Sequence, residues 1–216
     1  MIQFDNVTAQ YTKKAGIFDL SFKISEGEMV FLMGPTGAGK STVLRTIFRD
    51  IPVKKGKIYI SGEEITKRNK RETPHIRRKM GMIFQDFKLL NDRTIYENIA
   101  LPLRISRVPM RTIRKKVLEA LEDFNLVDRK NAFPLQLSGG EQQSVSIARA
   151  LIREPKIILA DEPTGNLDLN ISKTIIDILE QTANNGATVI MATHNFPLIR
   201  SRKKRFIELN EGSQVQ

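Results

Sequence analysis

The sequence predicts an α/β fold with a parallel core sheet, an N-terminal antiparallel β subdomain and an inserted helical subdomain at about residues 88–145. Three observations predict it. Four short apolar runs are typical of strands buried on both faces, and they lie at 29–33, 80–84, 157–160 and 188–192. Between the second and third runs, residues 111–124 carry apolar side chains at helical spacing. Near the start, apolar and polar residues alternate as in a half-buried strand, and the apolar members are Phe18, Leu20, Phe22 and Ile24.

The remaining elements complete this architecture in chain order. Residues 57–61 form a further short strand before Gly62. A helix over 172–182 returns the chain to the last core strand, and Asn184-Asn185-Gly186 offers its stop. We expect residues 1–216 to form a single domain with the helical insertion inside it.

Composition limits the classes of protein to which the sequence can belong. No apolar run approaches the roughly 20 residues that a membrane-spanning helix needs, and no signal peptide opens the sequence. The sequence contains no cysteine, so it has no disulfide framework. We therefore expect a cytoplasmic location.

The formal charge of +11 suits a nucleic acid, an anionic membrane face or simply a solvated surface. The excess lies mainly in two basic clusters, at 67–79 and 200–205. Neither cluster carries interleaved aromatic residues or the signature of a nucleic-acid-binding fold. We expect no nucleic-acid partner.

A glycine-rich segment directly after the first apolar run fits the P-loop pattern of two glycines, a lysine and a hydroxyl residue. The residues expected to bind nucleotide there are Gly34, Pro35, Thr36, Gly37, Ala38, Gly39, Lys40, Ser41 and Thr42. Glycines let such a loop turn its amide groups toward phosphate oxygens, and the following helix adds partial positive charge. Lys40 can neutralise the outer phosphates and Ser41 can bind Mg²⁺. A nucleoside triphosphate is the expected occupant.

Polar residues follow the other three core strands. Asp161-Glu162 ends the third strand, Gln85 follows the second, and Thr193-His194 follows the last. The carboxyl ends of parallel strands meet at one edge of the sheet, where ligands bind in open α/β folds. Asp161 is suited to magnesium and Glu162 to orienting or deprotonating an attacking water, while His194 can hydrogen-bond a terminal phosphate.

A second glycine-rich helix start occurs at Ser138-Gly139-Gly140-Glu141. Ser138 and Glu141 have the spacing of a capping box, and the amide-rich start of the helix can bind an anion. Because one phosphate loop already serves this domain, the second suggests contact with another molecule's nucleotide. Dimerisation around the nucleotide follows as a hypothesis.

In this order, the P-loop, Gln85, Leu-Ser-Gly-Gly-Glu, Asp161-Glu162 and His194 resemble the ATPases of ABC transporters over essentially the whole sequence. The resemblance implies a P-loop NTPase that hydrolyses ATP with Mg²⁺ and forms a head-to-tail homodimer. It also implies the residue roles. The catalytic residues are Glu162 as base, His194 as γ-phosphate switch and Gln85; the metal residues are Ser41, Gln85 and Asp161; Tyr11 stacks on adenine; Ser138, Gly139, Gly140 and Glu141 meet the other subunit's ATP; and Asn166, Leu167 and Asp168 form the D-loop.

Two positions depart from the family pattern. Family members usually carry arginine after Glu-Gln-Gln, where this sequence has Ser144. Aspartate is frequent after the switch histidine, where this sequence has Asn195. We call the helix that begins at Ser138 the signature helix. We expect Ser144 to alter the packing of this helix or the rate of hydrolysis, and Asn195 to alter local hydrogen bonding, with hydrolysis itself retained.

Within the family, the segments 84–90, 92–94 and 96–103 resemble the cell-division branch, the FtsE-like ATPases. That resemblance implies an integral membrane partner of the FtsX type, a peripheral position on the cytoplasmic face of the membrane, and control of peptidoglycan hydrolysis. Three alternatives stay open. They are the ATPase of a lipoprotein-release or macrolide-type exporter, an ATP-dependent recruitment switch in division with slow turnover, and a soluble ABC protein that acts on ribosomes or DNA.

Overall fold

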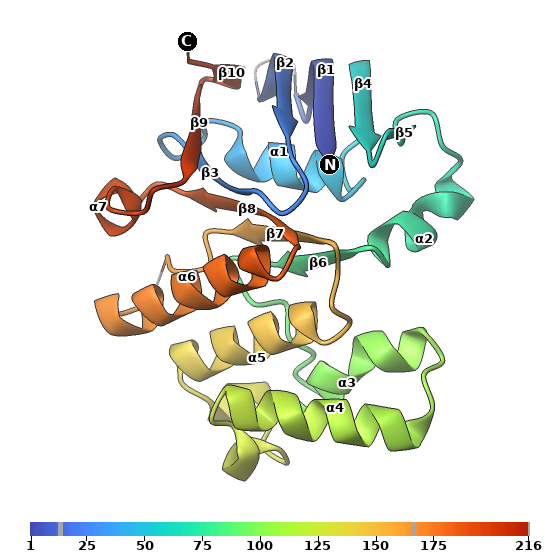
Figure 1. Cartoon of the computed structure of the whole chain (residues 1–216), viewed down its shortest axis with the longest axis vertical. Coiled ribbons are helices and arrows are strands. Elements are labelled where there is room, and N and C mark those ends of the chain that lie inside the picture. Colours follow the sequence, from blue (N-terminus) through green and yellow to red (C-terminus); the bar gives the residue numbers. More distant parts are fainter. Residues whose placement is uncertain (13–14, 166, 216) are drawn as a thin grey trace.

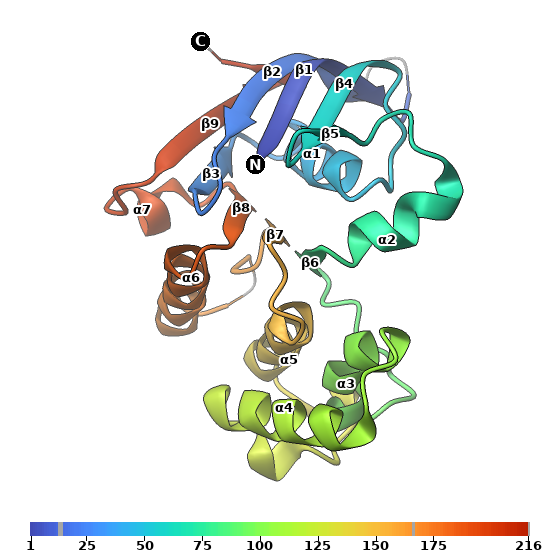
Figure 2. The same cartoon turned by 45° about the vertical axis from the view of Figure 1, so that its right-hand side comes forward.

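The computed structural model describes residues 1–12, 15–165 and 167–215, which form stacked layers (Figure 1). A small antiparallel sheet arches over helix α1, and a larger sheet lies on the other side of that helix (Figure 2). The small sheet has the order β2-β1-β4-β5. Its strands are β1 (Ile2–Gln10), β2 (Gly16–Ile24), β4 (Lys55–Ile60) and β5 (Glu63–Glu64). The predicted N-terminal antiparallel sheet is confirmed.

The larger sheet has the order β10-β9-β3-β8-β7-β6. Its strands are β3 (Met29–Met33), β6 (Met80–Ile83), β7 (Ile157–Asp161), β8 (Thr188–Thr193), β9 (Arg205–Asn210) and β10 (Ser213–Gln214). All residues of β6, β7 and β8 are buried, as the continuous apolar runs predict.

The four predicted core strands are parallel neighbours as expected, and a fifth parallel strand, β9, was not predicted. Strand β9 pairs in parallel with β3, and β10 pairs antiparallel with β9. Only Ile207 and Leu209 are buried in β9, because one face of this strand is exposed. The strand therefore lacks the continuous apolar run that marks its neighbours.

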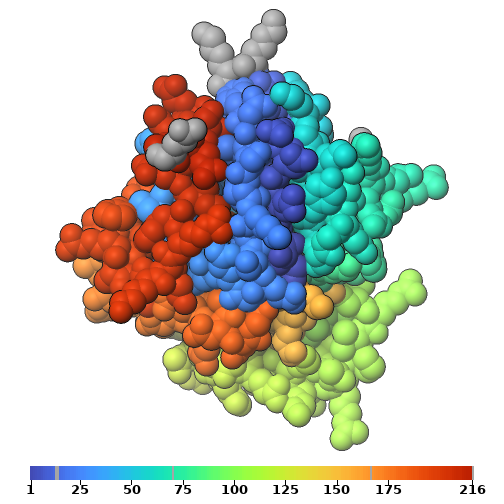
Figure 3. Space-filling model, turned by 45° about the horizontal axis from the view of Figure 1, so that its top comes forward, coloured from blue at the N-terminus to red at the C-terminus, as the bar shows by residue number. Residues whose placement is uncertain are grey.

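The alternation along β2 also breaks once. Leu20, Phe22 and Ile24 are buried as predicted, whereas Phe18 is only partly buried and Ile17 takes the core position. The cause is a shift in the pairing of β1 with β2 beside Asp19, whose φ is 48°. The amide of Phe18 donates to the carbonyl of Gly212 at 2.8 Å, so the C-terminal strands lie beside β2 (Figure 3).

Helices cover both faces of the large sheet. Helix α1 (Lys40–Ile47) packs between the two sheets, while α6 (Leu169–Asn184) lies on the opposite face with the short α7 (Phe196–Ile199). Helix α6 extends beyond the predicted 172–182 at both ends. It ends before Gly186, whose φ of 99° suits glycine. A short 3₁₀ turn (Lys70–Glu72) and α2 (Thr73–Arg77) connect the small sheet to β6.

A helical layer separates β6 from β7 in the sequence and lies below the sheets (Figure 2). It contains α3 (Ile95–Ile105), α4 (Met110–Asp123), two 3₁₀ turns (Val127–Arg129 and Pro134–Gln136) and α5 (Gly139–Leu151). Ile99, Val117, Leu121 and Val145 are fully buried in an apolar cluster of this layer. Helix α5 packs against α3 on one side and β6 on the other, so it joins the layer to the sheet.

None of the helices described is both long and apolar enough to span a bilayer.

Candidate active site

The carboxyl ends of β3, β6, β7 and β8 lie at one edge of the large sheet because these strands are parallel. Met33 is level with Thr193, Asp161 with Ala192, and Ile83 with Ala160. The segments that follow these strands are the ones in which sequence analysis expects ligand-binding residues. The register therefore brings the predicted groups to the same edge.

The P-loop connects β3 to α1 and has two glycines with unusual backbone geometry. Gly34 has a φ of 144°, and a Cβ there would overlap the carbonyl oxygen of Leu209. Gly39 is the N-cap of α1 with a φ of 98°, in the left-handed region that favours glycine. In the described structure, the backbone amides of Lys40, Ser41 and Thr42 donate to no carbonyl. These three donors at a helix start are free for an anion.

Lys40 is buried and folded back onto the loop. Its Nζ donates to the carbonyl oxygens of Gly34 at 2.8 Å and Pro35 at 3.0 Å. The same nitrogen lies 3.5 Å from Glu162 Oε1. The Lys40 ammonium group therefore lies against the backbone of the P-loop.

Ser41 and Asp161 contact each other across the site. The Ser41 hydroxyl donates to Asp161 Oδ1 at 2.8 Å. Burial raises the pKa of the Asp161 carboxyl, the neighbouring charge of Glu162 raises it further, and the Ser41 hydrogen bond opposes the shift. This pair presents two oxygen groups beside the first turn of α1.

Glu162 lies between Lys40 and His194. Its Oε2 is 2.9 Å from His194 Nδ1, and its side chain is 9% exposed whereas that of His194 is 52% exposed. Glu162 has a φ of 46°, an unfavourable value for a residue with a side chain. Its amide donates to the carbonyl of Ala192 at 3.0 Å, which fixes the turn after β7 to β8. A buried carboxylate is therefore held between two basic side chains.

Gln85 and Tyr11 form no such contacts among the described residues. Gln85 follows β6 by two residues and is exposed, and in the described residues it forms no hydrogen bond with the groups above. Tyr11 is half exposed, and the Arg45 guanidinium lies 5.6 Å from the centre of its ring. Because Arg45 belongs to α1, Tyr11 lies beside the helix that follows the P-loop.

The predicted capping box at Ser138 is confirmed. The amide of Glu141 donates to Ser138 Oγ at 3.3 Å, and the Glu141 carboxylate accepts from the Ser138 amide at 2.8 Å. That amide hydrogen bond lowers the pKa of Glu141. Across the described ranges, no hydrogen bond or ion pair connects these residues with the P-loop of the same chain.

The D-loop residues have structural contacts of their own. Asn166 lies outside the described residues. Leu167 packs against the apolar cluster beneath α6, and Asp168 caps that helix by accepting from the amides of Asn170 at 2.9 Å and Ile171 at 3.0 Å. Sequence analysis missed this capping role, although aspartate before an amphipathic helix is a known signal.

Comparison with known proteins identifies the family. Residues 17–165 match the profile of the ABC transporter family, and this range includes the P-loop, the capped start of α5 and Asp161-Glu162. The chain belongs to the ABC transporter family. Among its ABC relatives, the cell division ATP-binding protein FtsE of Escherichia coli K12 is 46% identical over 98% of this chain and 96% of its own length. The Bacillus subtilis FtsE is 45% identical over 91% of this chain and 86% of its own length.

A solved ABC structure has the same fold. The ATP-binding cassette MJ0796, determined as a dimer in a post-hydrolysis state with ADP and Pi, superposes with a TM-score of 0.91. It is 37% identical, and the match covers 100% of this chain and 97% of that chain. The predicted ABC-type architecture is confirmed.

The two departures from the ABC pattern have local partners. Ser144 Oγ donates to the carbonyl of Gly140 at 3.0 Å, one turn earlier in α5. Asn195 accepts from the amide of Leu198 at 3.2 Å and so caps α7. Each side chain hydrogen-bonds a backbone group of its own helix. In the part of the chain that the structure describes, neither forms a hydrogen bond with Lys40 or Glu162.

Sequence analysis also missed Gln143 of the ABC signature helix. Its Nε2 donates to the carbonyl of Pro163 at 2.8 Å, directly after Glu162. Its Oε1 is buried and has no hydrogen-bond partner within the ranges that the structure describes. No local pattern marks such a residue, because its function depends on a contact 20 residues away in the sequence.

Proposed function

We propose that the chain is the ATP-binding and ATP-hydrolysing subunit of a bacterial cell-division machine, in which it dimerises around ATP and drives an integral membrane partner of the FtsX type. Through that partner it regulates peptidoglycan hydrolysis and resides at the cytoplasmic face of the membrane. The observation that carries the proposal is the buried Glu162 carboxylate, 3.5 Å from Lys40 Nζ and 2.9 Å from His194 Nδ1. The names of the relatives supply the biological setting.

The proposed binding of ATP uses the loop 34–42. The free amides of Lys40, Ser41 and Thr42 belong to the first turn of α1, where the helix dipole favours a phosphate. When triphosphate binds, Lys40 Nζ exchanges its two carbonyl acceptors for phosphate oxygens, which are charged and therefore stronger acceptors. Tyr11 stacks on the adenine at the outer end of the site.

The residues at the site fit a magnesium ion. Mg²⁺ takes few protein oxygens when phosphates and water supply the rest of its shell. Ser41 and Asp161 offer such oxygens side by side. Burial raises the pKa of Asp161, so a cation bound beside it would stabilise the ionised carboxylate. Gln85 is the third proposed group. Bound there, the ion would offset the negative charge on the phosphates.

Glu162 is proposed as the general base. A base must reach the attacking water and keep its carboxylate ionised. Lys40 supplies a positive charge next to one oxygen of Glu162, and His194 bonds the other. When Lys40 turns to the phosphates, Glu162 Oε1 becomes free to orient water, and His194 holds the carboxylate or meets the γ-phosphate.

Dimerisation supplies the second half of the site. Ser138, Gly139, Gly140 and Glu141 start α5 and, in the described residues, bond no part of this chain's own P-loop. The related cassette MJ0796 was solved as a dimer. We propose that these residues, carried by an inserted helical subdomain at about 88–145, contact the ATP of a second copy, with 166–168 crossing the interface.

We propose a surface groove as the contact site for the membrane partner. The groove of about 420 Å³ lies where β6 meets the helical layer, next to the segment after Gln85, and no acidic side chain of the described residues lines it. Apolar residues and cations line it instead, and they include Met80, Met82, Phe84, Leu101, Ile105, Arg77, Arg78, Lys88, Arg149 and Arg153. Elsewhere in the basic clusters, Arg68 pairs with Glu63 and Glu72, and Arg202 with Asp177 and Glu180, so part of that charge is paired within the chain.

The partner is tested with the Glu162→Gln protein, which we expect to bind ATP and remain dimeric. It is purified with ATP from gently solubilised membranes of its host, and its companions are identified by mass spectrometry. The Lys40→Ala protein, which lacks the phosphate-binding cation, is the control and should not hold ATP or retain the ATP-dependent companion.

A single FtsX-like protein would support the proposed division function. An exporter or a lipoprotein permease as the companion would contradict that function in favour of transport. Ribosomal or nucleic-acid companions would contradict the membrane assignment.

A further inference from the structure

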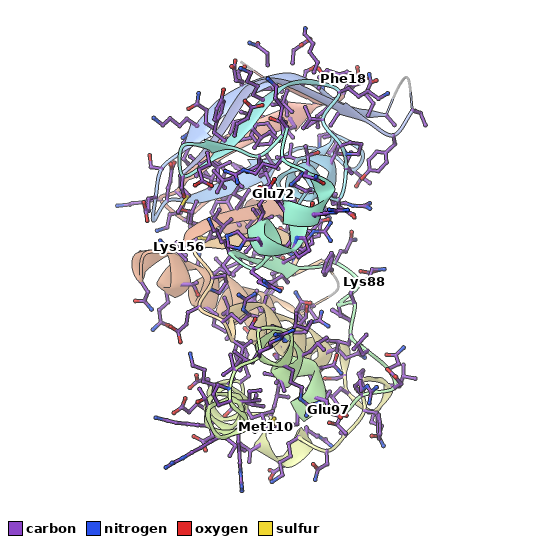
Figure 4. All side chains as sticks on the ribbon, turned by 90° about the vertical axis from the view of Figure 1, so that its right-hand side faces the viewer. Phe18, Glu72, Lys88, Glu97, Met110 and Lys156 are labelled. Atoms are coloured by element: carbon purple, nitrogen blue, oxygen red, sulfur yellow. The ribbon has the colours of Figure 1, made fainter. Side chains whose placement is uncertain are left out.

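The segment just after Gln85 has a strained backbone. Phe87 has a φ of 58° and Lys88 a φ of 49°, so two consecutive residues with side chains lie in the left-handed region. Each costs roughly 1 kcal/mol or more and persists only where surrounding contacts impose it. Lys88 lies at the junction between the sheets and the helical layer (Figure 4).

Helix α5 imposes this conformation through two side chains. Arg149 donates from Nη1 to the carbonyl of Lys88 and from Nη2 to the carbonyl of Phe87, both at 2.7 Å. Ser146 Oγ donates to the same Phe87 carbonyl at 3.3 Å. A planar guanidinium can bond two successive carbonyls at once, which a lysine ammonium at one point cannot match.

The guanidinium of Arg149 is partly buried and lines the groove described above. Among the described residues it forms no ion pair, and burial lowers its pKa to about 10, which leaves it charged at neutral pH. Partial burial withdraws the guanidinium from water, and no carboxylate among the described residues pairs with it to offset that cost. The two hydrogen bonds from Arg149 fix the backbone conformation of Phe87 and Lys88.

Helix α5 also reaches the other side of the active site. Gln143 on the same helix donates to the carbonyl of Pro163, next to Glu162, and the helix begins at Ser138. A shift of α5 therefore acts on the turn after Glu162 and, through Arg149, on the segment after Gln85.

We infer that Arg149 is a positioning residue for the ATPase reaction: it clamps Phe87-Lys88 to α5 and so fixes the start of the segment that follows Gln85, the residue proposed above to bind magnesium. The inference rests on the role proposed above for Gln85. It assigns no contact with substrate to Arg149. The clamp makes the position of Gln85 depend on the position of the signature helix.

The test compares Arg149→Gln with Arg49→Gln in the full chain. Arg49 is a matched control because it also donates to two successive backbone carbonyls, those of Arg68 and Asn69, and burial also lowers its pKa. We expect Arg149→Gln to lower kcat about tenfold and to raise the half-saturating Mg²⁺ concentration by about as much. ATP binding, measured without hydrolysis, should change less than about twofold. Arg49→Gln should leave all three unchanged.

A double-mutant cycle with Gln85→Ala separates positioning from general damage. If Arg149 acts through Gln85, then Arg149→Gln should lower kcat less than about twofold further in the Gln85→Ala background. Full additivity of the two losses would overturn the inference. Wild-type turnover in Gln85→Ala alone would contradict the role proposed for Gln85, and the inference with it.

Backbone rescue keeps the test informative if Arg149→Gln folds poorly. Glycine adopts a positive φ without strain, so Lys88→Gly should restore much of the kcat lost in Arg149→Gln. Lys88→Ala removes the same ion pair with Asp86 but keeps the strain, and it should restore nothing. Ser146→Ala, a milder change, should shift the Mg²⁺ dependence in the same direction. Equal effects of glycine and alanine, or no shift for Ser146→Ala, would overturn the clamp.

Discussion

Charge and burial conflict at Asp161. Its carboxylate is placed to bind a cation, yet burial and Glu162 raise its pKa in the ATP-free protein. A raised carboxyl pKa means that the folded state disfavours the ionised form. The protonated carboxyl is tolerated at low pH, and the folded state loses stability relative to the unfolded chain as pH rises through the raised pKa. At neutral pH, Asp161 therefore reduces stability in exchange for function.

Asp161→Asn should remove that conflict. We expect the free energy of unfolding of the ATP-free protein to rise by on the order of 1 kcal/mol at pH 7, while ATP turnover is lost. The gain should shrink as pH falls toward about 3.9, the ordinary aspartate pKa. Urea unfolding across this pH range measures it. A variant that is less stable than wild type at pH 7 would show that the Ser41 hydrogen bond outweighs the burial of charge.

The positions of the candidate site residues were largely readable from the sequence. Lys40, Ser41, Asp161, Glu162 and His194 lie together because each follows a predicted core strand at the same edge. Roles that depend on distant contacts were not readable. Arg149 looks like an ordinary cation on a helix until its two carbonyl partners, about 60 residues earlier, are known.

At the scale of elements, continuous apolar runs identified four buried strands almost to the residue. Strand β9 was not predicted because one of its faces is exposed and it lacks a continuous apolar run. Helix α3 was not predicted because Pro102 lies within it. Its capping box at Thr94 and Glu97 was nevertheless present in the sequence. The register shift beside Asp19 could not be read either, since strand pairing is decided by the partner strand.

The two capping boxes of the helical layer allow a matched comparison. Thr94 caps α3 and Ser138 caps α5 with the same reciprocal hydrogen bonds. We expect Thr94→Ala and Ser138→Ala each to lower the free energy of unfolding by about 1 kcal/mol. Only Ser138→Ala should weaken ATP-dependent dimerisation, because only that helix start is proposed to meet nucleotide. Urea unfolding measures the stability of the two variants, and analytical ultracentrifugation measures their ATP-dependent dimerisation. Equal effects on dimerisation would remove the special role of Ser138.

At the scale of the whole molecule, the catalytic edge, α5 and the groove form one connected path. Helix α1 lies on one face of the large sheet, and α5, which belongs to the helical layer, lies on the other (Figure 1). Helix α5 carries the residues proposed to meet a second copy's ATP, and the segment it clamps borders the groove proposed for the membrane partner. Closure of two copies around ATP would thus reach the partner through a single helix.

The most direct test of this account is the oligomeric state and turnover of Glu162→Gln with ATP and Mg²⁺. The substitution keeps the shape of the side chain and removes the base, so we expect a stable dimer with bound ATP and turnover lowered by about 100-fold or more. Lys40→Ala should remain without nucleotide and monomeric under the same conditions. Wild-type turnover by Glu162→Gln, or an ATP-bound protein that stays monomeric, would contradict the account.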